Sequence, residues 1–149
     1  EIYRALVEAT AYGTRLILEN FRENGLEIRS FIASGGIPKK DHFLMQTYAD
    51  VLDMEIRVAE ADECGALGSA VYALFAAGKE NGGYGTYEEA VSHMIPPAVK
   101  TYKPDQKHVS VYDRLYREYL RLHDAFGRNE DSPMQKLLKI RKQAWNEER

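Results

Sequence analysis

Cysteine is almost missing from this sequence: Cys64 is the single example among 149 residues. A lone cysteine excludes a disulfide within the chain, and scarce cysteine is typical of a reducing compartment, so we expect a cytoplasmic protein. No apolar run approaches the roughly 20 residues of a membrane-spanning helix. The N-terminal stretch also lacks the apolar core of a signal peptide. We therefore expect no membrane partner.

An excess of positive charge is also missing. The 20 lysines and arginines are outnumbered by 23 aspartates and glutamates, which gives a net charge of −3. Nucleic-acid-binding domains usually carry a basic surface, so we expect no nucleic-acid partner. The four histidines are scattered without the spacing of metal ligands, and we expect no metal site built from this chain alone.

The remaining composition is that of an ordinary folded domain, with 44% hydrophobic and 29% charged residues. The first residue is Glu1 and not methionine, and a helical pattern is already under way there. We therefore expect a piece of a longer protein. Apolar residues recur with a 3.6-residue period over residues 1–24, and Gly25 is a natural left-handed stop. This pattern predicts a long amphipathic helix.

Short apolar runs at 31–33 and 55–59 predict two buried strands, and a third extended segment at 98–106 predicts an edge strand. Helices alternate with the first two strands, which is typical of parallel strands joined by right-handed crossovers. The predicted fold is therefore α/β and helix-rich, with two to three short strands and about six helices.

The segment 63–77 is small or apolar at almost every position, which predicts a buried helix with Asp62 as its N-cap. The glycine-rich loop "KENGGYG" follows, and we interpret it as a flexible surface connection because no strand precedes it. Thr86 and Glu89 have the spacing of a capping box, which predicts a further short helix.

Two adjacent glycines, Gly35 and Gly36, end the first strand, and Asp41 is placed to cap the helix after them. Glycines allow positive φ and close approach of a ligand to the backbone, but they also make tight strand-to-helix corners. Neither the Walker A spacing nor the dinucleotide-binding spacing is present, so residues alone leave both interpretations open. We interpret Lys39 and Lys40 as a solvated corner, because exposed lysines are the norm.

The stretch "ASGGIPKKDHFLMQTYADVLDMEIRVAEADECGALGSAVYALFAAG" resembles the C-terminal domain of the FGGY family of carbohydrate kinases. The likeness rests on the glycine pair before "LMQ.YAD", on "A.D...ALG.A" after a short strand, and on the tail "VYDRLYREYLRLHDAFG". It implies a partial ribonuclease-H-like, actin-like ATPase domain. In that family, ATP and Mg²⁺ occupy the cleft between two domains.

By the same resemblance, residues 1–149 form part of the nucleotide-binding C-terminal domain, with an α/β portion at 1–95 and a helical tail at 96–149. The N-terminal sugar-binding domain is absent. The resemblance assigns to the nucleotide a set of cofactor-binding residues around the first turn: Gly35, Gly36, Ile37, Lys40 and Asp41. It assigns no catalytic residue here, since the catalytic base, the phosphate-binding turns and most Mg²⁺ contacts belong to a preceding region.

The activity implied is transfer of the ATP γ-phosphate to a pentulose, L-ribulose, in arabinose breakdown. Xylulose and glycerol stay open as substrates, as does a homodimer of the full-length protein, and we expect this piece alone to be inactive. An alternative of another class is a non-catalytic helical module that docks through helix 63–77 and through the tyrosines of residues 108–126.

Overall fold

The computed structural model describes residues 1–98, 100–129 and 131–147, which divide into two compact units, Glu1–Val109 and Ser110–Arg149. Residue 99 of the predicted third strand segment lies outside the described residues. Residues 130, 148 and 149 of the predicted helical tail do so as well. Among the helices described, none combines the length and apolar character that crossing a membrane requires.

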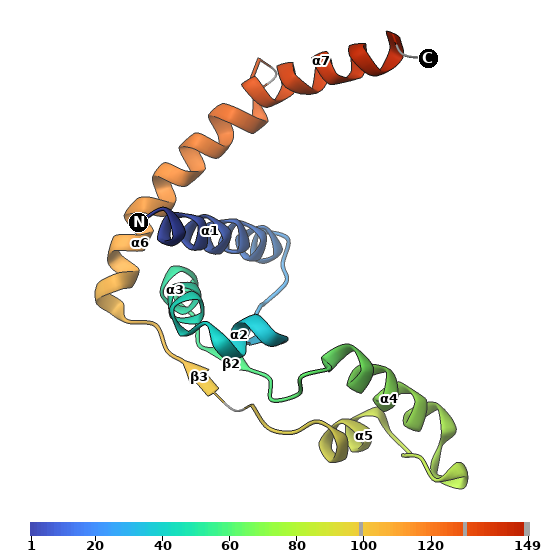
Figure 1. Ribbon diagram of the computed structural model, residues 1–149. Coiled ribbons are helices and arrows are strands. Elements are labelled where there is room, and N and C mark those ends of the chain that lie inside the picture. The colour runs from blue at the N-terminus through green and yellow to red at the C-terminus, as the bar shows by residue number, and fades with distance from the viewer. Residues whose placement is uncertain (99, 130, 148–149) are drawn as a thin grey trace. The chain divides into compact units, whose positions relative to one another are not determined.

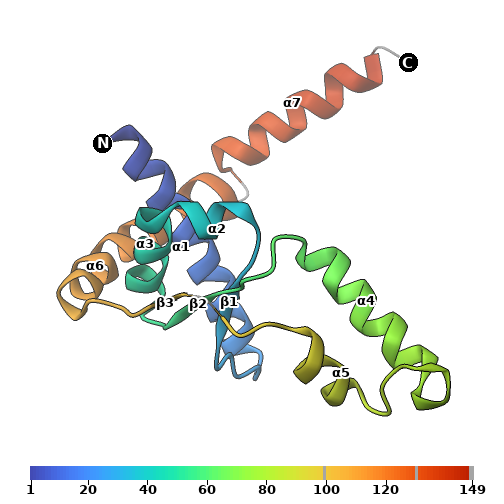
Figure 2. The ribbon, with the colours of Figure 1, turned by 60° about the horizontal axis from the view of Figure 1, so that its bottom comes forward.

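Helix α1 (Ile2–Glu23) matches the predicted amphipathic helix. It ends at Asn24, and Gly25 follows with a φ of 82°, as the left-handed stop requires. The helix runs beside α3 (His42–Leu52) in both ribbon views (Figures 1 and 2). Arg15 joins the two helices, because its guanidinium donates a hydrogen bond of 3.1 Å to the carbonyl oxygen of Val51.

The sheet has three short strands in the order β1-β2-β3. Strands β1 (Phe31–Ala33) and β2 (Ile56–Val58) are parallel, which confirms the prediction, and β3 (Lys100–Tyr102) pairs with β2 in the antiparallel direction. Ile56 and Val58 are fully buried at the centre of this sheet. The core that covers them comes from α1, α3 and the flanking strands: Leu18, Ala33, Met45, Ala49, Leu52 and Tyr102.

Two helices follow β1. Helix α2 (Gly36–Lys40) is a single turn with no buried residue, and α3 (His42–Leu52) is packed deeply into the core. Asp41 caps α3, as predicted, by accepting a hydrogen bond of 2.9 Å from the backbone N–H of Leu44. The glycine pair is therefore separated from α3 by one short helical turn.

Helix α4 (Cys64–Ala77) begins one residue later than predicted, and the prediction that it is buried is wrong. Val71 is its one buried residue, while Tyr72 is 62% exposed and Phe75 is 40% exposed. The physical reason is coverage: α5 (Tyr87–Met94) packs against one side of α4, through Tyr72, Phe75 and Tyr87. An apolar helix stays exposed where no other element lies against it.

The glycine-rich loop between α4 and α5 begins with a 3-10 turn, Lys79–Asn81. The loop then folds back onto the end of α4, where the N–H of Tyr84 donates to the carbonyl oxygen of Leu74 at 3.1 Å. The loop lies on the surface, as predicted, and its backbone hydrogen bonds give it a defined turn. Thr86 caps α5 as predicted, with 3.1 Å between its hydroxyl oxygen and the N–H of Glu89.

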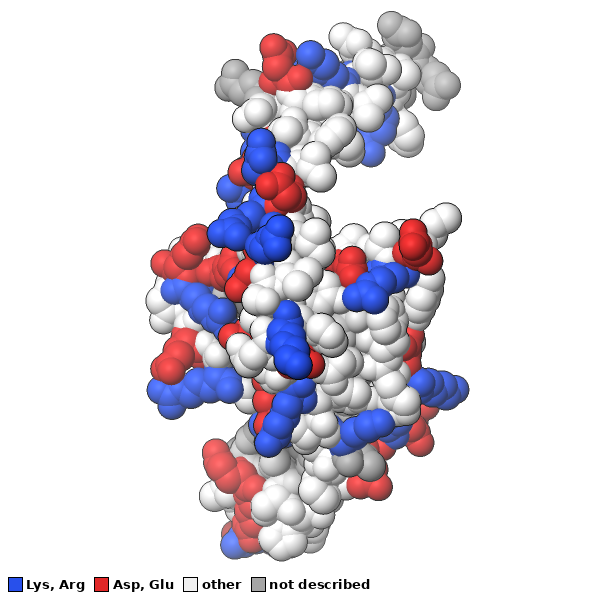
Figure 3. Space-filling view, turned by 90° about the vertical axis from the view of Figure 1, so that its left-hand side faces the viewer, with Lys and Arg blue, Asp and Glu red and all other residues white. Residues whose placement is uncertain are grey.

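Helix α6 (Gln106–His123) begins in the first unit and continues into the second, where a π-helical turn (Asp124–Arg128) and α7 (Pro133–Glu147) follow. Figure 3 shows basic and acidic side chains interspersed over the face drawn there. In the second unit, two arginines pair with nearby acids: Arg121 with Glu118 at 3.0 Å and Arg128 with Asp124 at 3.5 Å.

Candidate functional site

The candidate site lies where the parallel strands β1 and β2 end at the same edge of the sheet. The N–H of Ala59 donates to the carbonyl oxygen of Ala33 at 2.9 Å, which extends the pairing by one residue beyond the strands. The chain then diverges, to the glycine pair on one side and to residues 60–62 on the other. Ligands of α/β proteins typically bind at the carboxyl ends of parallel strands, so this divergence marks the place to examine.

Gly35 has a backbone that requires glycine, with φ at 100° and ψ at −179°. Gly36 has no such requirement, since its φ is not positive. A Cβ atom built on either glycine meets nothing within 4 Å, so the chain leaves the space above both residues open. Nothing within the described residues therefore explains why Gly36 should lack a side chain.

Asp41 has both carboxylate oxygens engaged. One accepts from the N–H of Leu44 and the other accepts from the hydroxyl of Tyr3 on α1. The hydrogen bond from Tyr3, with that from Leu44, lowers the pKa of Asp41, and the same bond raises the pKa of Tyr3. The carboxylate is therefore charged at neutral pH and holds the start of α3. Its predicted contact with a nucleotide stays a prediction.

The prediction of a solvated corner is wrong for Lys39. Its ammonium group donates to the backbone carbonyl oxygen of Glu60 and lies 2.5 Å from the carboxylate of Asp62. The side chain of Lys39 is only 25% exposed as a result. Lys40 and Ile37 lie on the exposed surface of the same turn. Of these three residues, Lys39 is the one that faces the neighbouring turn.

The prediction that Asp62 caps α4 is also wrong. The N-cap position belongs to Glu63, which makes no side-chain capping bond. Asp62 points to Lys39 instead, and the hydrogen bond and positive charge of Lys39 lower its pKa. A lysine 23 residues earlier in the sequence competes successfully for the carboxylate that would otherwise cap the helix.

A pocket of about 430 Å³ lies next to this contact. Its walls combine apolar and charged side chains from α2, from β2 and the turn after it, and from β3: Pro38, Lys39, Val58, Glu60, Asp62 and Lys100. On β3, the ammonium group of Lys100 lies 2.8 Å from Nδ1 of His42. The pocket therefore borders α2 on the side of the Lys39 contact.

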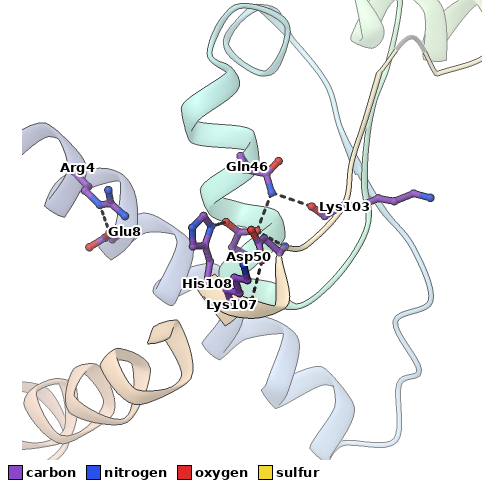
Figure 4. Close-up of polar contacts among 8 residues, drawn as sticks. Arg4, Glu8, Gln46, Asp50, Lys103, Lys107 and His108 are labelled. Atoms are coloured by element: carbon purple, nitrogen blue, oxygen red, sulfur yellow. Dashed lines mark hydrogen bonds and ion pairs between the residues drawn. The ribbon is translucent and has the colours of Figure 1, made fainter. Parts of the chain in front are cut away.

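A polar network around Asp50 was not predicted from the sequence (Figure 4). Asp50 is 2% exposed, and its carboxylate accepts hydrogen bonds from Gln46, from the N–H of Asp105 and from Nδ1 of His108, at 2.8, 2.8 and 2.9 Å. Figure 4 shows Gln46 and His108 directed at Asp50 from α3 and from the start of α6. Three donors satisfy the buried carboxylate, which fixes the segment after β3 against α3.

The i, i+4 spacing of Gln46 and Asp50 on a helix was a readable signal for half of this network. His108 gave no signal, because it lies 58 residues further along the chain. Asp50 is the buried member of this network, whereas the side chain of His108 is 60% exposed. The network joins α3 to the segment after β3 and to the start of α6.

Gly35 and Gly36 present bare backbone to open space, and one ion pair, between Lys39 and Asp62, lies beside them. In the part of the chain that the structure describes, no group of three or more His, Cys, Asp or Glu side chains could hold a metal ion.

The sequence of this chain is similar to those of known carbohydrate kinases. The sequence pattern of the FGGY family of carbohydrate kinases, C-terminal domain, matches residues 1–77. The ribulokinase of Bacillus licheniformis is 52% identical over 141 residues, which cover 95% of this chain and 25% of that protein. The chain thus spans about a quarter of the length of the curated relatives it matches.

Solved structures agree on the fold. The xylulose kinase from Rhodospirillum rubrum superposes with a TM-score of 0.68 at 26% identity, over 82% of this chain and 24% of that one. The gluconate kinase from Lactobacillus acidophilus superposes with a TM-score of 0.72 at 22% identity, over 86% of this chain and 25% of that one. These similarities confirm the predicted helix-rich α/β fold, and they come from kinases named for different substrates.

Proposed function

Because this chain belongs to the FGGY family of carbohydrate kinases, we propose that the full-length protein containing it transfers the γ-phosphate of ATP to L-ribulose. The observation that supports this substrate is the 52% identity to a ribulokinase over 95% of the chain. The structural matches do not favour one substrate, since one is named a xylulose kinase and another a gluconate kinase. On this proposal the protein acts in arabinose breakdown in the cytoplasm.

Within that protein, we propose that this chain supplies the adenosine side of an interdomain cleft. The place of the glycine pair supports the assignment, because it follows the carboxyl end of β1 and leaves open space beside the backbone of Gly36. Bare backbone allows a planar base or a ribose to approach closely. Ile37, Lys40 and Asp41 are the neighbours of that surface, with Asp41 already engaged in holding α3.

Phosphoryl transfer depends mainly on positioning and on stabilisation of charge. This chain contributes positioning: it holds one end of the nucleotide while groups elsewhere in the protein act on the phosphates. Mg²⁺ would neutralise charge on those phosphates, and the described residues offer no cluster of ligands for it. We therefore propose that the metal is held through phosphate oxygens and through residues outside this chain.

The proposal is tested by a substrate panel with the purified full-length protein. ATP-dependent phosphorylation is measured for L-ribulose, xylulose and glycerol under identical conditions, with residues 1–149 alone as the inactive control. We expect kcat/KM for L-ribulose to exceed that for the other two by at least about tenfold, equivalent to ~1.4 kcal/mol. A preference for xylulose or glycerol would replace the substrate, and no phosphorylation of any of them would contradict the proposal.

A further inference from the structure

The turn that carries the glycine pair is not held by the core. Helix α2 has five residues, none of them buried, and so short a helix is not stable by itself. Its orientation must therefore come from contacts at its ends and from its side chains. At its C-terminal end, Asp41 ties the chain to α1 and α3. The hydrogen bonds of the Asp41 side chain are to Tyr3 and Leu44, and neither residue belongs to α2.

Lys39 supplies the second contact. It lies three residues after Gly36, which is close to one helical turn, and its ammonium group reaches the turn that follows β2. There it meets one backbone oxygen, of Glu60, and one carboxylate, of Asp62. We call these two interactions the Lys39 bridge. It joins the two turns at the point where the parallel strands have already diverged.

On this geometry we propose that Lys39 is a positioning residue, whose bridge holds Gly36 at the orientation that the nucleotide requires. The inference rests on the proposed nucleotide-binding function of the glycine pair. It concerns a residue that does not touch the nucleotide and acts through α2. Asp62 has a role in this proposal as the side-chain partner of Lys39. Its contribution can be removed by a substitution that leaves the backbone unchanged.

The exposure of the two partners sets the expected size of the effect. Asp62 is 84% exposed, and an ion pair with an exposed partner contributes little by itself. Loss of the Lys39 ammonium group removes both interactions, whereas loss of the Asp62 carboxylate leaves the hydrogen bond to Glu60 in place. We therefore expect loss of Lys39 to matter more than loss of Asp62.

The test compares Lys39→Gln, Asp62→Asn and the double variant in the full-length protein. The readouts are KM for ATP, KM for L-ribulose, kcat, and the dissociation constant of a fluorescent ATP analogue. Lys39→Gln is expected to raise KM for ATP and the dissociation constant by about threefold to tenfold, with kcat and the sugar KM unchanged. Asp62→Asn is expected to raise them by about twofold. The double variant should resemble Lys39→Gln, since residues of one network are not additive.

Lys100→Gln is the matched control, because it removes a positive charge from the wall of the same pocket without touching the bridge. An equal rise in KM for ATP in this variant would show a general effect of charge and would overturn the proposal. An unchanged KM for ATP in Lys39→Gln would also overturn the proposal. The same holds for a Lys39→Gln variant in which kcat falls and both KM values rise by equal factors. Gly36→Ala distinguishes failure of the Lys39 proposal from failure of the proposed function. If Gly36→Ala also leaves ATP affinity unchanged, the assignment of the glycine pair to the nucleotide is wrong.

Discussion

Two turns of this chain carry neighbouring glycines, at Gly35–Gly36 and at Gly82–Gly83, and their surroundings differ. A Cβ atom on Gly83 would lie 1.9 Å from the carbonyl oxygen of Leu74, whereas a Cβ atom on Gly36 would meet nothing within 4 Å. Packing within the chain accounts for Gly83. No atom of the described chain lies near the added Cβ of Gly36, as is also the case for Gly65, Gly68 and Gly127. On the proposed function, ATP lies beside Gly36.

The comparison shows how the structural role of a glycine can be separated from a binding role. A glycine required by packing or by backbone conformation should be costly to replace in stability. A glycine required by a ligand should be inexpensive to replace in stability and costly in affinity. Four substitutions test this division, and each is best measured in the full-length protein.

The largest loss of stability is expected for Gly83→Ala. The new methyl group would overlap a backbone carbonyl oxygen that cannot rotate away, so the end of α4 or the loop must shift. Overpacking of this kind costs about 1–3 kcal/mol, and contact with rigid backbone places it at the upper end, near ~3 kcal/mol. Amide hydrogen exchange of peptides covering residues 74–90 measures it, and protection equal to that of the unaltered protein would contradict the packing explanation.

Gly35→Ala is expected to have the next largest effect. The backbone at φ 100° and ψ −179° is essentially restricted to glycine, and a residue held in such a region costs of order 1–3 kcal/mol, here about 2 kcal/mol. The cost comes from conformation and not from a clash, since no atom lies near the added methyl group. A urea-unfolding midpoint identical to that of the unaltered protein would show that α2 adopts another geometry.

Gly85→Ala sharpens the comparison within the packed loop. The nearest atom to its Cβ is the side-chain Cε of Lys79 at 2.7 Å, and a long flexible side chain can move aside. We expect a change within about 0.5 kcal/mol, as for most surface substitutions. A loss as large as that of Gly83→Ala, in the same exchange experiment, would mean that Lys79 is held rigidly by its ion pair with Glu89.

The smallest change in stability is expected for Gly36→Ala. Its φ is not positive, its Cβ would have free space, and alanine favours the helical conformation that α2 begins there. The unfolding midpoint should therefore be the same or slightly higher than in the unaltered protein. A clear loss of stability would show that the fold of the chain requires glycine at position 36, as it does at position 83.

Much of the fold was readable from local signals. The period of α1, the strands β1 and β2, and the caps at Asp41 and Thr86 all depend on residues within a few positions of one another. Such signals are present in the sequence itself, because helix periodicity and capping involve neighbouring residues. The glycine turn was found in the same way, whereas its assignment to a nucleotide came from the family resemblance and stays a proposal.

Interactions between distant residues were not readable. Lys39 was predicted to be solvated and Asp62 to be a cap, yet they meet each other across 23 residues. The exposure of α4 was missed for a related reason: its composition predicts burial, but composition does not say which element covers a helix. For the site, the sequence indicated the turn and its bare backbone, while the bridge that orients the turn required the structure.

On the proposed function, ATP occupies the open space beside Gly36, and the affinity of the Gly36→Ala protein for ATP tests this most directly. Calorimetric titration of the full-length protein with ATP, and separately with L-ribulose, measures both affinities in one preparation. We expect the variant to bind ATP at least about tenfold more weakly, equivalent to ~1.4 kcal/mol, and to bind L-ribulose with unchanged affinity. Unaltered ATP affinity in a normally folded Gly36→Ala protein would contradict it.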